Sequence, residues 1–134
     1  MTDCVFCKIV KGEIQSNTVY EDESNLAFLD INPQAMGHTM VISKTHASSL
    51  LELDDDKLKS LIIAVKEMAK KIKDKLNPDG FSYGINQGKI SGQSVPHLHI
   101  HIFPRYENDG GSSVHSIVKN PGPRSVEEIY EVLK

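Results

Sequence analysis

The pattern of apolar and polar residues predicts three short strands in the first third of the chain. Residues 18–21 and 26–29 are rich in β-branched or aromatic side chains, and the polar residues 22–25 separate them. Such a pair of runs is typical of a β-hairpin. After the loop 32–37, the segment 38–43 alternates between apolar and polar residues, and it is therefore predicted as a third strand.

From Asp54 onward the spacing of apolar residues changes to three and four, which is typical of an amphipathic helix that faces a core. The residues that recur at this spacing are Leu58, Leu61, Ile62, Val65, Ala69, Ile72 and Leu76. The acidic residues 54–56 favour the N-terminus of this helix, and the sequence 77–80, with a proline and a glycine, ends it. We therefore expect one long helix.

Two further strands are predicted at 81–86 and 97–103, joined by the glycine-bearing loop 87–94. Hairpin-length links between the early strands, and one long helix before the last pair, favour an antiparallel sheet over repeated βαβ units. The predicted fold is α+β: an antiparallel sheet of about five strands with one long helix and one or two short ones.

The region after Arg105 carries a different pattern. Residues 107–123 are rich in Gly, Ser, Asn and Pro, as loops are. Residues 125–133 are predicted as a short terminal helix, because Ser125 can cap it and Glu128 follows three residues later.

Composition sets the broad class. With 134 residues and 39% hydrophobic content, we expect residues 1–134 to form a single domain. The net charge of -3 does not attract a polyanion over the whole surface, so no nucleic acid is expected as a partner. No apolar run approaches the ~18 residues of a membrane helix, and the N-terminus lacks the pattern of a secretion signal. We expect a cytoplasmic protein with no membrane partner.

The last predicted strand carries histidines at alternate positions: His97, His99 and His101. The two-residue period of a strand sends these imidazoles to one face and the apolar residues between them to the other, toward the core. Each imidazole has ring nitrogens that need hydrogen-bond partners, so three in a row are poor packing material. The pattern therefore favours a chemical role.

Two other interpretations of the histidines stay open on the residues alone. The first is an exposed polar face of an amphipathic strand, although Thr, Lys or Glu would normally fill such a face. The second is ligation of a catalytic metal by all three imidazoles. This interpretation would give the two cysteines of the chain no role.

The stretch 92–103 resembles the signature of the histidine-triad (HIT) superfamily, His-φ-His-φ-His-φ-φ, where φ is apolar. The similarity extends through 4–14, 26–31 and 37–44, so it covers residues 1–105 and leaves 106–134 as a variable tail. The most similar branch is that of the histidine-triad nucleotide-binding proteins, which hydrolyse nucleoside phosphoramidates and form dimers with a continuous sheet. The resemblance thus implies a homodimer and a purine nucleotide substrate such as an adenylated amine.

An imidazole suits attack on an α-phosphorus, because its ordinary pKa of ~6.5 leaves it mostly neutral at pH 7. The resemblance implies that His99 becomes transiently nucleotidylated and that water then releases the nucleoside monophosphate. It places His101 at the phosphate oxygens and Ser94 among the catalytic residues. His38 corresponds to a histidine that supports the others, although on the residues alone it could be an ordinary strand histidine bonded to backbone.

The resemblance also places Ser94 and Asn86 in contact with substrate. The amides around Gly92 and Gln93 are donors that a phosphate or a leaving group could approach closely. Asp30 matches the acid that accepts the ribose hydroxyls, although an aspartate before Asn-Pro is also a common turn residue. The apolar slot for the base corresponds to Val5, Phe6, Ile9, Leu29 and Ile31. Any of these five could instead be core.

The two cysteines, Cys4 and Cys7, have the spacing of metal ligands, and tetrahedral zinc would need two more nitrogen or sulfur ligands. The resemblance implies that His46 and His97 complete the set. Four protein ligands leave no open position for water, so this zinc would be structural. One alternative is a redox pair, but the sequence around the cysteines lacks the thioredoxin-type pattern that such a pair needs. A second alternative is a pair of free, unreactive thiols.

Several functions remain open at this level. The leading hypothesis is a nucleoside phosphoramidate hydrolase. A dinucleoside polyphosphate hydrolase, a zinc-stabilised nucleotide-binding scaffold with little turnover, and a nucleotidyl transferase are the others. Ser43 stands where the family often has proline, and the tail after Arg105 matches no pattern. Because that tail often shapes the leaving-group side in this family, the leaving group stays undetermined.

Overall fold

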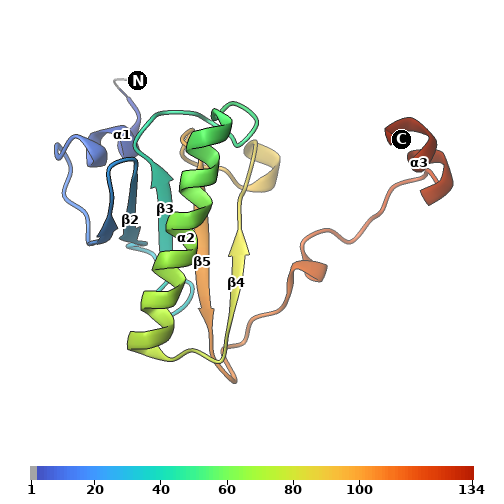
Figure 1. The fold of residues 1–134 in the computed structure, drawn as a ribbon. Coiled ribbons are helices and arrows are strands. Elements are labelled where there is room, and N and C mark those ends of the chain that lie inside the picture. The colour runs from blue at the N-terminus through green and yellow to red at the C-terminus, as the bar shows by residue number, and fades with distance from the viewer. Residues whose placement is uncertain (1–2) are drawn as a thin grey trace.

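Five antiparallel strands form one sheet in the computed structural model, which describes residues 3–134 (Figure 1). The order across the sheet is β1-β2-β3-β5-β4, and each neighbouring pair is antiparallel. The strands are β1 Thr18–Glu21, β2 Asn25–Leu29, β3 Thr39–Ser43, β4 Gly80–Gly84 and β5 His99–Arg105. The helices are α1 Val5–Val10, α2 Asp55–Leu76 and α3 Val126–Leu133, with short 3-10 turns η1 Lys89–Ser91 and η2 Val114–Ser116. The predicted α+β class is confirmed.

The turn of the predicted hairpin β1–β2 is stabilised by hydrogen bonds to a side chain. Asp22 Oδ1 accepts from the main-chain N–H groups of Ser24 and Asn25, each at 2.8 Å. An aspartate that binds the backbone two residues ahead stabilises a tight turn. The polar residues between the two runs are thus what reverses the chain.

Helix α2 lies across one face of the sheet (Figure 1) and begins and ends as predicted. Asp54 caps its N-terminus by accepting from the N–H groups of Asp56 and Lys57, and Asn77 ends it in a left-handed conformation (φ 49°). Its buried residues are Leu61, Ala64, Val65, Met68, Ala69 and Ile72. They form the main core with apolar residues of the sheet, including Val41, Ile100 and Ile102.

Two residues expected in that core lie outside it. The side chain of Ile62 is 54% exposed and that of Leu76 is 43% exposed. The sheet covers only one stripe of the helix, and Ile62 lies on the flank that lines a groove with Phe81 and Tyr83 of β4. Leu76 instead extends over the loop before β3, close to Gly37.

The last two strands are displaced from their predicted bounds. Strand β5 begins at His99 rather than at residue 97, because the N–H of Leu98 bonds to the carbonyl of Ala47 and not to the sheet. Strand β4 ends at Gly84 instead of residue 86, where its pairing with His101 stops. The alternation of side chains was predicted correctly. The alternation does not indicate where the backbone hydrogen bonds between the strands begin and end.

The second face of the sheet is also covered, by the short helix α1 (Figure 1), an element that the apolar pattern did not indicate. A second cluster joins Cys4, Phe6 and Cys7 from this segment to four apolar residues of β2 and β3. The face that carries the histidines is therefore interior: His97 is 0% exposed and His99 is 6% exposed. The interpretation as an exposed polar face is wrong for these two residues.

The tail leaves the sheet beside β4, and α3 lies apart from it (Figure 1). The predicted cap is confirmed: Ser125 Oγ accepts from the N–H of Glu128, and the Glu128 carboxylate accepts from the N–H of Ser125. Every residue from 107 to 134 is exposed. Across residues 3–134, no helix is both long enough and apolar enough to cross a membrane.

Candidate functional site

Strand β5 presents His99 and His101 on the face covered by α1. In the register with β3, His99 lies opposite Ile42 and His101 opposite Met40. The ring of Phe6 meets the His99 ring edge-on, with 5.1 Å between centroids and an interplanar angle of 89°. The Phe6 ring therefore limits the orientations open to the His99 imidazole.

The hydrogen bond that His99 makes fixes its tautomer. Its Nδ1 lies 2.7 Å from the main-chain carbonyl oxygen of His97. A carbonyl oxygen only accepts, so Nδ1 carries the proton and donates it. The neutral ring then keeps a free lone pair on Nε2, which is what a nucleophile requires.

A second chain of hydrogen bonds fixes the tautomers of His38 and His101. The N–H of Gln34 donates to His38 Nδ1 at 3.2 Å, so the proton of the neutral His38 ring is on Nε2. His38 Nε2 lies 2.9 Å from His101 Nδ1 and donates to it. The proton of His101 is therefore on Nε2, the atom on the side of its ring away from His38.

Burial keeps both rings of this pair neutral. It lowers the pKa of His38, with the nearby Asp30 carboxylate opposing the shift. Burial, followed by the charges that His99 and His38 can carry, lowers the pKa of His101 to about 4. At neutral pH, His101 is therefore an uncharged hydrogen-bond donor.

A cavity of about 330 Å³ opens over these rings. Five predicted site residues besides the histidines line it: Phe6, Asp30, Asn86, Gly92 and Ser94. Together with His38, His99 and His101 they come from α1, the end of β2, the approach to β3, the loop after β4, and β5. The fold thus gathers most of the residues predicted for catalysis and substrate binding around one space.

Asp30 makes the contact of a turn aspartate with one carboxylate oxygen and faces the site with the other. Its Oδ1 accepts from the N–H of Asn32 at 2.9 Å, as a turn aspartate does. Its Oδ2 lies 3.6 Å from His38 Nε2 and lines the same cavity as the histidines. One carboxylate oxygen is thus committed to the turn and the other faces the site.

The loop before the histidines is stabilised by hydrogen bonds of its own residues. Gly92 adopts φ +99°, a conformation that favours glycine, and its N–H donates to the carbonyl of Lys89. Gln93 donates from its side chain to the carbonyls of Ser48 and Val95, and its N–H donates to the carbonyl of Gly88. Both amides proposed as phosphate donors are therefore engaged in the loop, and Gln93 is outside the lining of the cavity.

The residues expected around the base are less tightly gathered. Phe6 lines the cavity of the histidines, whereas Ile9 and Ile31 line a neighbouring hollow. Val5 and Leu29 line neither. Ile31 is 82% exposed, so it is not core.

Four residues that line the cavity were not predicted from the sequence: Gln34, Met40, Val95 and Phe103. Gln34 lines the cavity and holds His38, but nothing in a loop glutamine indicates this. Phe103 also lines it, and here a signal was present: Phe103 continues the two-residue period of the histidines and so had to share their face.

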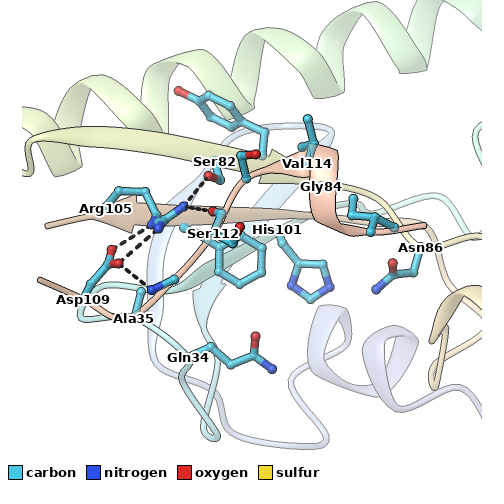
Figure 2. Close-up of a pocket in the computed structure, with 15 residues that line it drawn as sticks. Gln34, Ala35, Ser82, Gly84, Asn86, His101, Arg105, Asp109, Ser112 and Val114 are labelled. Atoms are coloured by element: carbon cyan, nitrogen blue, oxygen red, sulfur yellow. Dashed lines mark hydrogen bonds and ion pairs between the residues drawn. The ribbon is translucent and has the colours of Figure 1, made fainter. Parts of the chain in front are cut away.

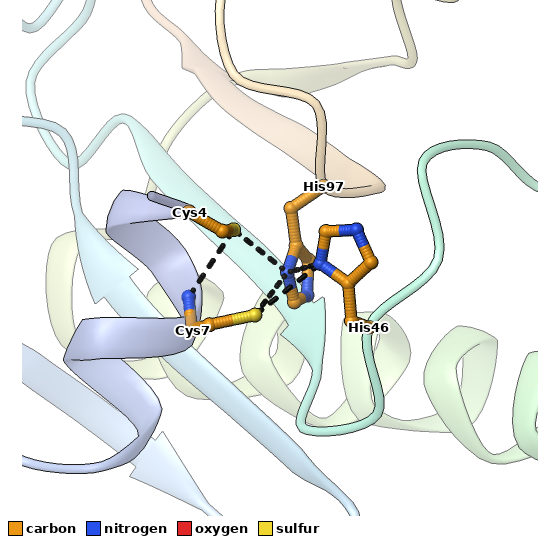
Figure 3. Close-up of side chains that lie close together, drawn as sticks. All are labelled: Cys4, Cys7, His46 and His97. Carbon is orange, nitrogen blue, oxygen red and sulfur yellow. Dashed lines mark hydrogen bonds between the residues drawn. The ribbon is translucent and has the colours of Figure 1, made fainter. Parts of the chain in front are cut away.

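The two cysteines meet His46 and His97 at the other end of the histidine face (Figure 3). The four ligand atoms all lie within 4.8 Å of one another and could hold a metal ion. His46 Nδ1 lies 3.2 Å from His97 Nδ1 and 3.2 Å from Cys7 Sγ. His97 Nδ1 lies 3.5 Å from Cys4 Sγ and 3.6 Å from Cys7 Sγ.

The hydrogen bonds and the burial of these four residues are compatible with a bound cation. His97 Nε2 donates to the carbonyl of Ser43 at 2.8 Å, which leaves the lone pair on Nδ1, toward the cysteines. Burial, and then the neighbouring Cys4, raises the pKa of the Cys7 thiol. Buried thiols with this arrangement ionise when a metal supplies the compensating charge.

Comparisons with known proteins identify the family of the chain. The model of the HIT domain family matches residues 11–108, which include His38, His46 and the three histidines of the strand region. The chain belongs to the HIT family. An uncharacterized HIT-like protein of Methanocaldococcus jannaschii is 49% identical over 131 residues, which is 98% of this chain and 96% of that protein.

Other HIT relatives carry functional names or solved structures. An adenosine 5'-monophosphoramidase of Schizosaccharomyces pombe is 40% identical over 83% of this chain and 80% of its own length. The crystal structure of a HIT family member from Bacillus subtilis has a TM-score of 0.85 and 40% identity, and covers 97% of this chain and 92% of that one. The structural likeness to this HIT protein thus extends beyond the residues that the family model matches.

Proposed function

We propose that the protein hydrolyses purine nucleoside phosphoramidates at the α-phosphate through a nucleotidyl-histidine intermediate. The observation that carries this proposal is the fixed tautomer of His99, whose Nε2 lone pair is free in a ring that lines a cavity. The name of the Schizosaccharomyces pombe relative supports the substrate class.

In the first step the Nε2 lone pair of His99 forms a bond to the α-phosphorus while the bond from phosphorus to the amine nitrogen breaks. The departing nitrogen takes up a proton and leaves as the amine. In the second step water attacks the phosphorus, the bond from phosphorus to Nε2 breaks, and one proton of the water is released. The products are the nucleoside monophosphate and the regenerated neutral His99.

Stabilisation of the phosphoryl oxygens falls to neutral donors held in place before the substrate binds. His101 offers its Nε2–H, and Ser94 offers a hydroxyl from the adjoining loop. Preorganised donors are effective because they need no rearrangement as the charge develops. Asn86 completes the polar lining of this side of the cavity.

The nucleoside would lie toward α1 and the end of β2. Asp30 Oδ2 is the acceptor for the ribose hydroxyls, because Asp30 Oδ1 is already used by Asn32. Phe6, Ile9 and Ile31 offer apolar surface for the base, which gives affinity and little discrimination between bases.

The four-residue cluster at Cys4, Cys7, His46 and His97 is proposed to bind one structural zinc ion. In tetrahedral zinc, ligand bonds of ~2.0 Å to nitrogen and ~2.3 Å to sulfur place two nitrogens ~3.3 Å apart and nitrogen and sulfur ~3.6 Å apart. The separations in this cluster, 3.2 Å and 3.2–3.6 Å, fit those values. Such an ion would fasten α1 to the strand that carries His99, and it takes no part in the reaction.

A homodimer in the cytoplasm is also proposed. Strand β4 is one of the two edges of the sheet, and the apolar groove beside it includes Ile62, Phe81 and Tyr83. A second copy that pairs its own β4 along this edge would continue the sheet and cover the groove. Ligation of zinc by thiolates agrees with a reducing compartment.

The test of the proposed function is the detection of a covalent nucleotide adduct on the protein. Wild-type protein is mixed with adenosine 5'-phosphoramidate, quenched in denaturant and weighed intact, and His99→Asn and His115→Asn are treated in the same way. We expect an adenylate adduct that maps to His99 in the wild type and in His115→Asn, and none in His99→Asn. Release of AMP by His99→Asn at the wild-type rate would overturn the proposal.

A further inference from the structure

Two groups of polar side chains outside the lining of the catalytic cavity differ in what they leave free. In the first, the Arg105 guanidinium donates to both carboxylate oxygens of Asp109, to Ser82 Oγ and to the carbonyl of Ser112 (Figure 2). This pair satisfies itself and offers no group for further chemistry. The second is the cysteine–histidine cluster of Cys4, Cys7, His46 and His97. Its two sulfurs have a reactivity that the proposed function does not use.

Helix α1 brings the two sulfurs together (Figure 3). Cys4 caps the helix and Cys7 is its third residue, and the N–H of Cys7 donates to Cys4 Sγ at 3.4 Å. The two sulfurs lie within 4.8 Å of each other. A Cys-x-x-Cys pair at the start of a helix is also the arrangement of dithiol redox motifs. The apolar pattern did not indicate α1, so the sequence alone lacked this context.

A hollow of about 660 Å³ gives a small reagent a route to this pair. Its lining includes Cys4 and His46 but not Cys7. Both cysteines are nearly buried, at 4% and 8% exposed, so the hollow leads a reagent to Cys4 first. The carboxylates of Asp3 and Glu52 also line it, and they favour the entry of a neutral molecule over that of an anion. Hydrogen peroxide is small and neutral.

We propose that Cys4 and Cys7 form a peroxide-sensitive dithiol site. Their oxidation to a disulfide removes two ligands of the cysteine–histidine cluster, releases the zinc ion and weakens nucleotide binding in the neighbouring cavity. The effect on nucleotide binding rests on the proposed function. The oxidation and the release of zinc rest only on the cluster.

The oxidation takes two steps. The Cys4 thiolate attacks one oxygen of hydrogen peroxide, the O–O bond breaks, and the departing hydroxide takes a proton from solvent and leaves as water. Cys4 is then a sulfenic acid. In the second step the Cys7 thiolate attacks the Cys4 sulfur, the S–O bond breaks, and a second hydroxide takes a proton and leaves as water. The two sulfurs lose two electrons, which reduce the peroxide to two molecules of water.

The disulfide no longer holds a metal ion. A thiolate is the form of cysteine that binds zinc, and the disulfide contains none. His46 and His97 then remain as half of a tetrahedral ligand set, so the ion dissociates. A dithiol reductant regenerates both thiols by exchange, which makes the change reversible.

Phe6 connects this site to the catalytic cavity. It lies between the two cysteines in α1, lines the cavity, and packs its ring 5.1 Å from that of His99. With zinc bound, the cluster ties both flanks of Phe6 to His97, beside the strand that carries His99. Loss of the ion leaves α1 held by packing alone, so the apolar wall of the cavity is less fixed. We therefore expect the affinity for nucleotide to fall, with little change in the chemical step.

The experiment treats the zinc-loaded, full-length protein with a small molar excess of hydrogen peroxide. Released zinc is followed with a chromophoric chelator, and the protein is weighed intact. We expect the release of about one zinc ion per chain and, over the same time course, the loss of about 2 Da, the two hydrogens of a disulfide. The KM for adenosine 5'-phosphoramidate should rise about fivefold with kcat nearly unchanged. Dithiothreitol and zinc should restore all three values.

Variants assign the sulfurs. In Cys7→Ser the second step is blocked, so we expect a sulfenic acid on Cys4 that dimedone traps, whereas Cys4→Ser should give no such adduct. Met36→Leu is the matched control, because Met36 is also an oxidisable sulfur residue, is 65% exposed, and lines neither the hollow nor the catalytic cavity. It should behave as the wild type. Thermal unfolding identifies any variant that is not folded, and the wild-type measurements stand without the variants.

Each other outcome overturns a stated part of the inference. Zinc that stays bound while methionine is oxidised, or a disulfide that forms only between chains, would overturn the dithiol site. An adduct on Cys7 in Cys4→Ser, with none in Cys7→Ser, would overturn the assignment of Cys4 as the first sulfur. Release of zinc with an unchanged KM would overturn the connection through Phe6. Untreated protein that releases no AMP would overturn the proposed function, while the zinc and mass measurements would still decide the redox site.

Discussion

His38 donates a hydrogen bond from Nε2 to Nδ1 of His101 across 2.9 Å. Because the N–H of Gln34 occupies the other nitrogen of His38, the direction of this bond is fixed. The consequence is that His101 keeps its own proton on Nε2. A loop amide outside the reaction thus determines which atom of a proposed catalytic residue is a donor.

This relationship predicts the effect of His38→Ala. Removal of the His38 ring frees His101 Nδ1, so His101 can adopt either tautomer and loses part of its population as an Nε2 donor. We expect kcat for adenosine 5'-phosphoramidate to fall by about tenfold to a hundredfold, in the range of a lost general acid or positioned donor. Steady-state kinetics measure it, and His115→Ala, on the exposed tail, is the control. A kcat equal to that of the wild type would contradict the assigned direction of the bond.

The lowered pKa of His101 predicts a loss of stability in acid. The folded protein holds this pKa at about 4, whereas an unfolded histidine titrates near ~6.5. Between these values the unfolded chain binds a proton that the folded chain does not, so the free energy of unfolding falls as the pH drops from ~6.5 to ~4, by about 2 to 3 kcal/mol. Above that window His101 makes no contribution to the pH dependence.

Denaturant unfolding at a series of pH values checks this loss. His101→Asn should show a shallower slope across the window, because the group that titrates has been removed. His115→Asn should keep the wild-type slope. Parallel curves for the wild type and His101→Asn would assign the acid sensitivity to other groups.

Removal of the proposed zinc ion should affect stability far more than catalysis. Treatment with a strong chelator is expected to lower the free energy of unfolding by several kcal/mol, since an ion bound only by the folded state stabilises it. His46→Ala should lower the melting temperature and the zinc content in the same way. Turnover measured well below the melting temperature should persist in that variant.

Elemental analysis and thermal unfolding provide the readouts for the zinc prediction. His115→Ala, another histidine outside the cluster, should retain one zinc ion per chain and the wild-type melting temperature. A normal zinc content in His46→Ala would remove His46 from the ligand set.

The loop before Ser94 gives a further prediction through Gly92. A Cβ at this position meets only ordinary contacts with Asn86, so the cost of Gly92→Ala is the positive φ of +99°. Gly122→Ala is a matched control, because Gly122 also has a positive φ, +84°, and lines neither the catalytic cavity nor the hollow proposed for the base. Both variants should lose about 1 kcal/mol of stability. Only Gly92→Ala should also lose activity, and equal activities would show that the loop does not position Ser94.

Sequence determined the features of this protein that depend on a few neighbouring residues. The alternation that places His99 and His101 opposite Ile100 follows from the two-residue period of any strand. The capping box of Ser125 and Glu128, and the ends of α2, follow from local hydrogen bonds. In each case the partners are close in the chain, so backbone geometry alone brings them together.

Tertiary structure decided which distant residues meet. Cys4 reaches His97 across 93 positions, and His38 reaches His101 across 63. Only the order β3-β5-β4 and the covering of the second face by α1 create these contacts. The same holds for Arg105, which lies beyond the predicted strand 97–103 and whose side chain bonds to the main-chain carbonyl of Ser112 in the tail. Periodicity specifies the direction in which a side chain points, but the partner it finds there depends on how the whole chain packs.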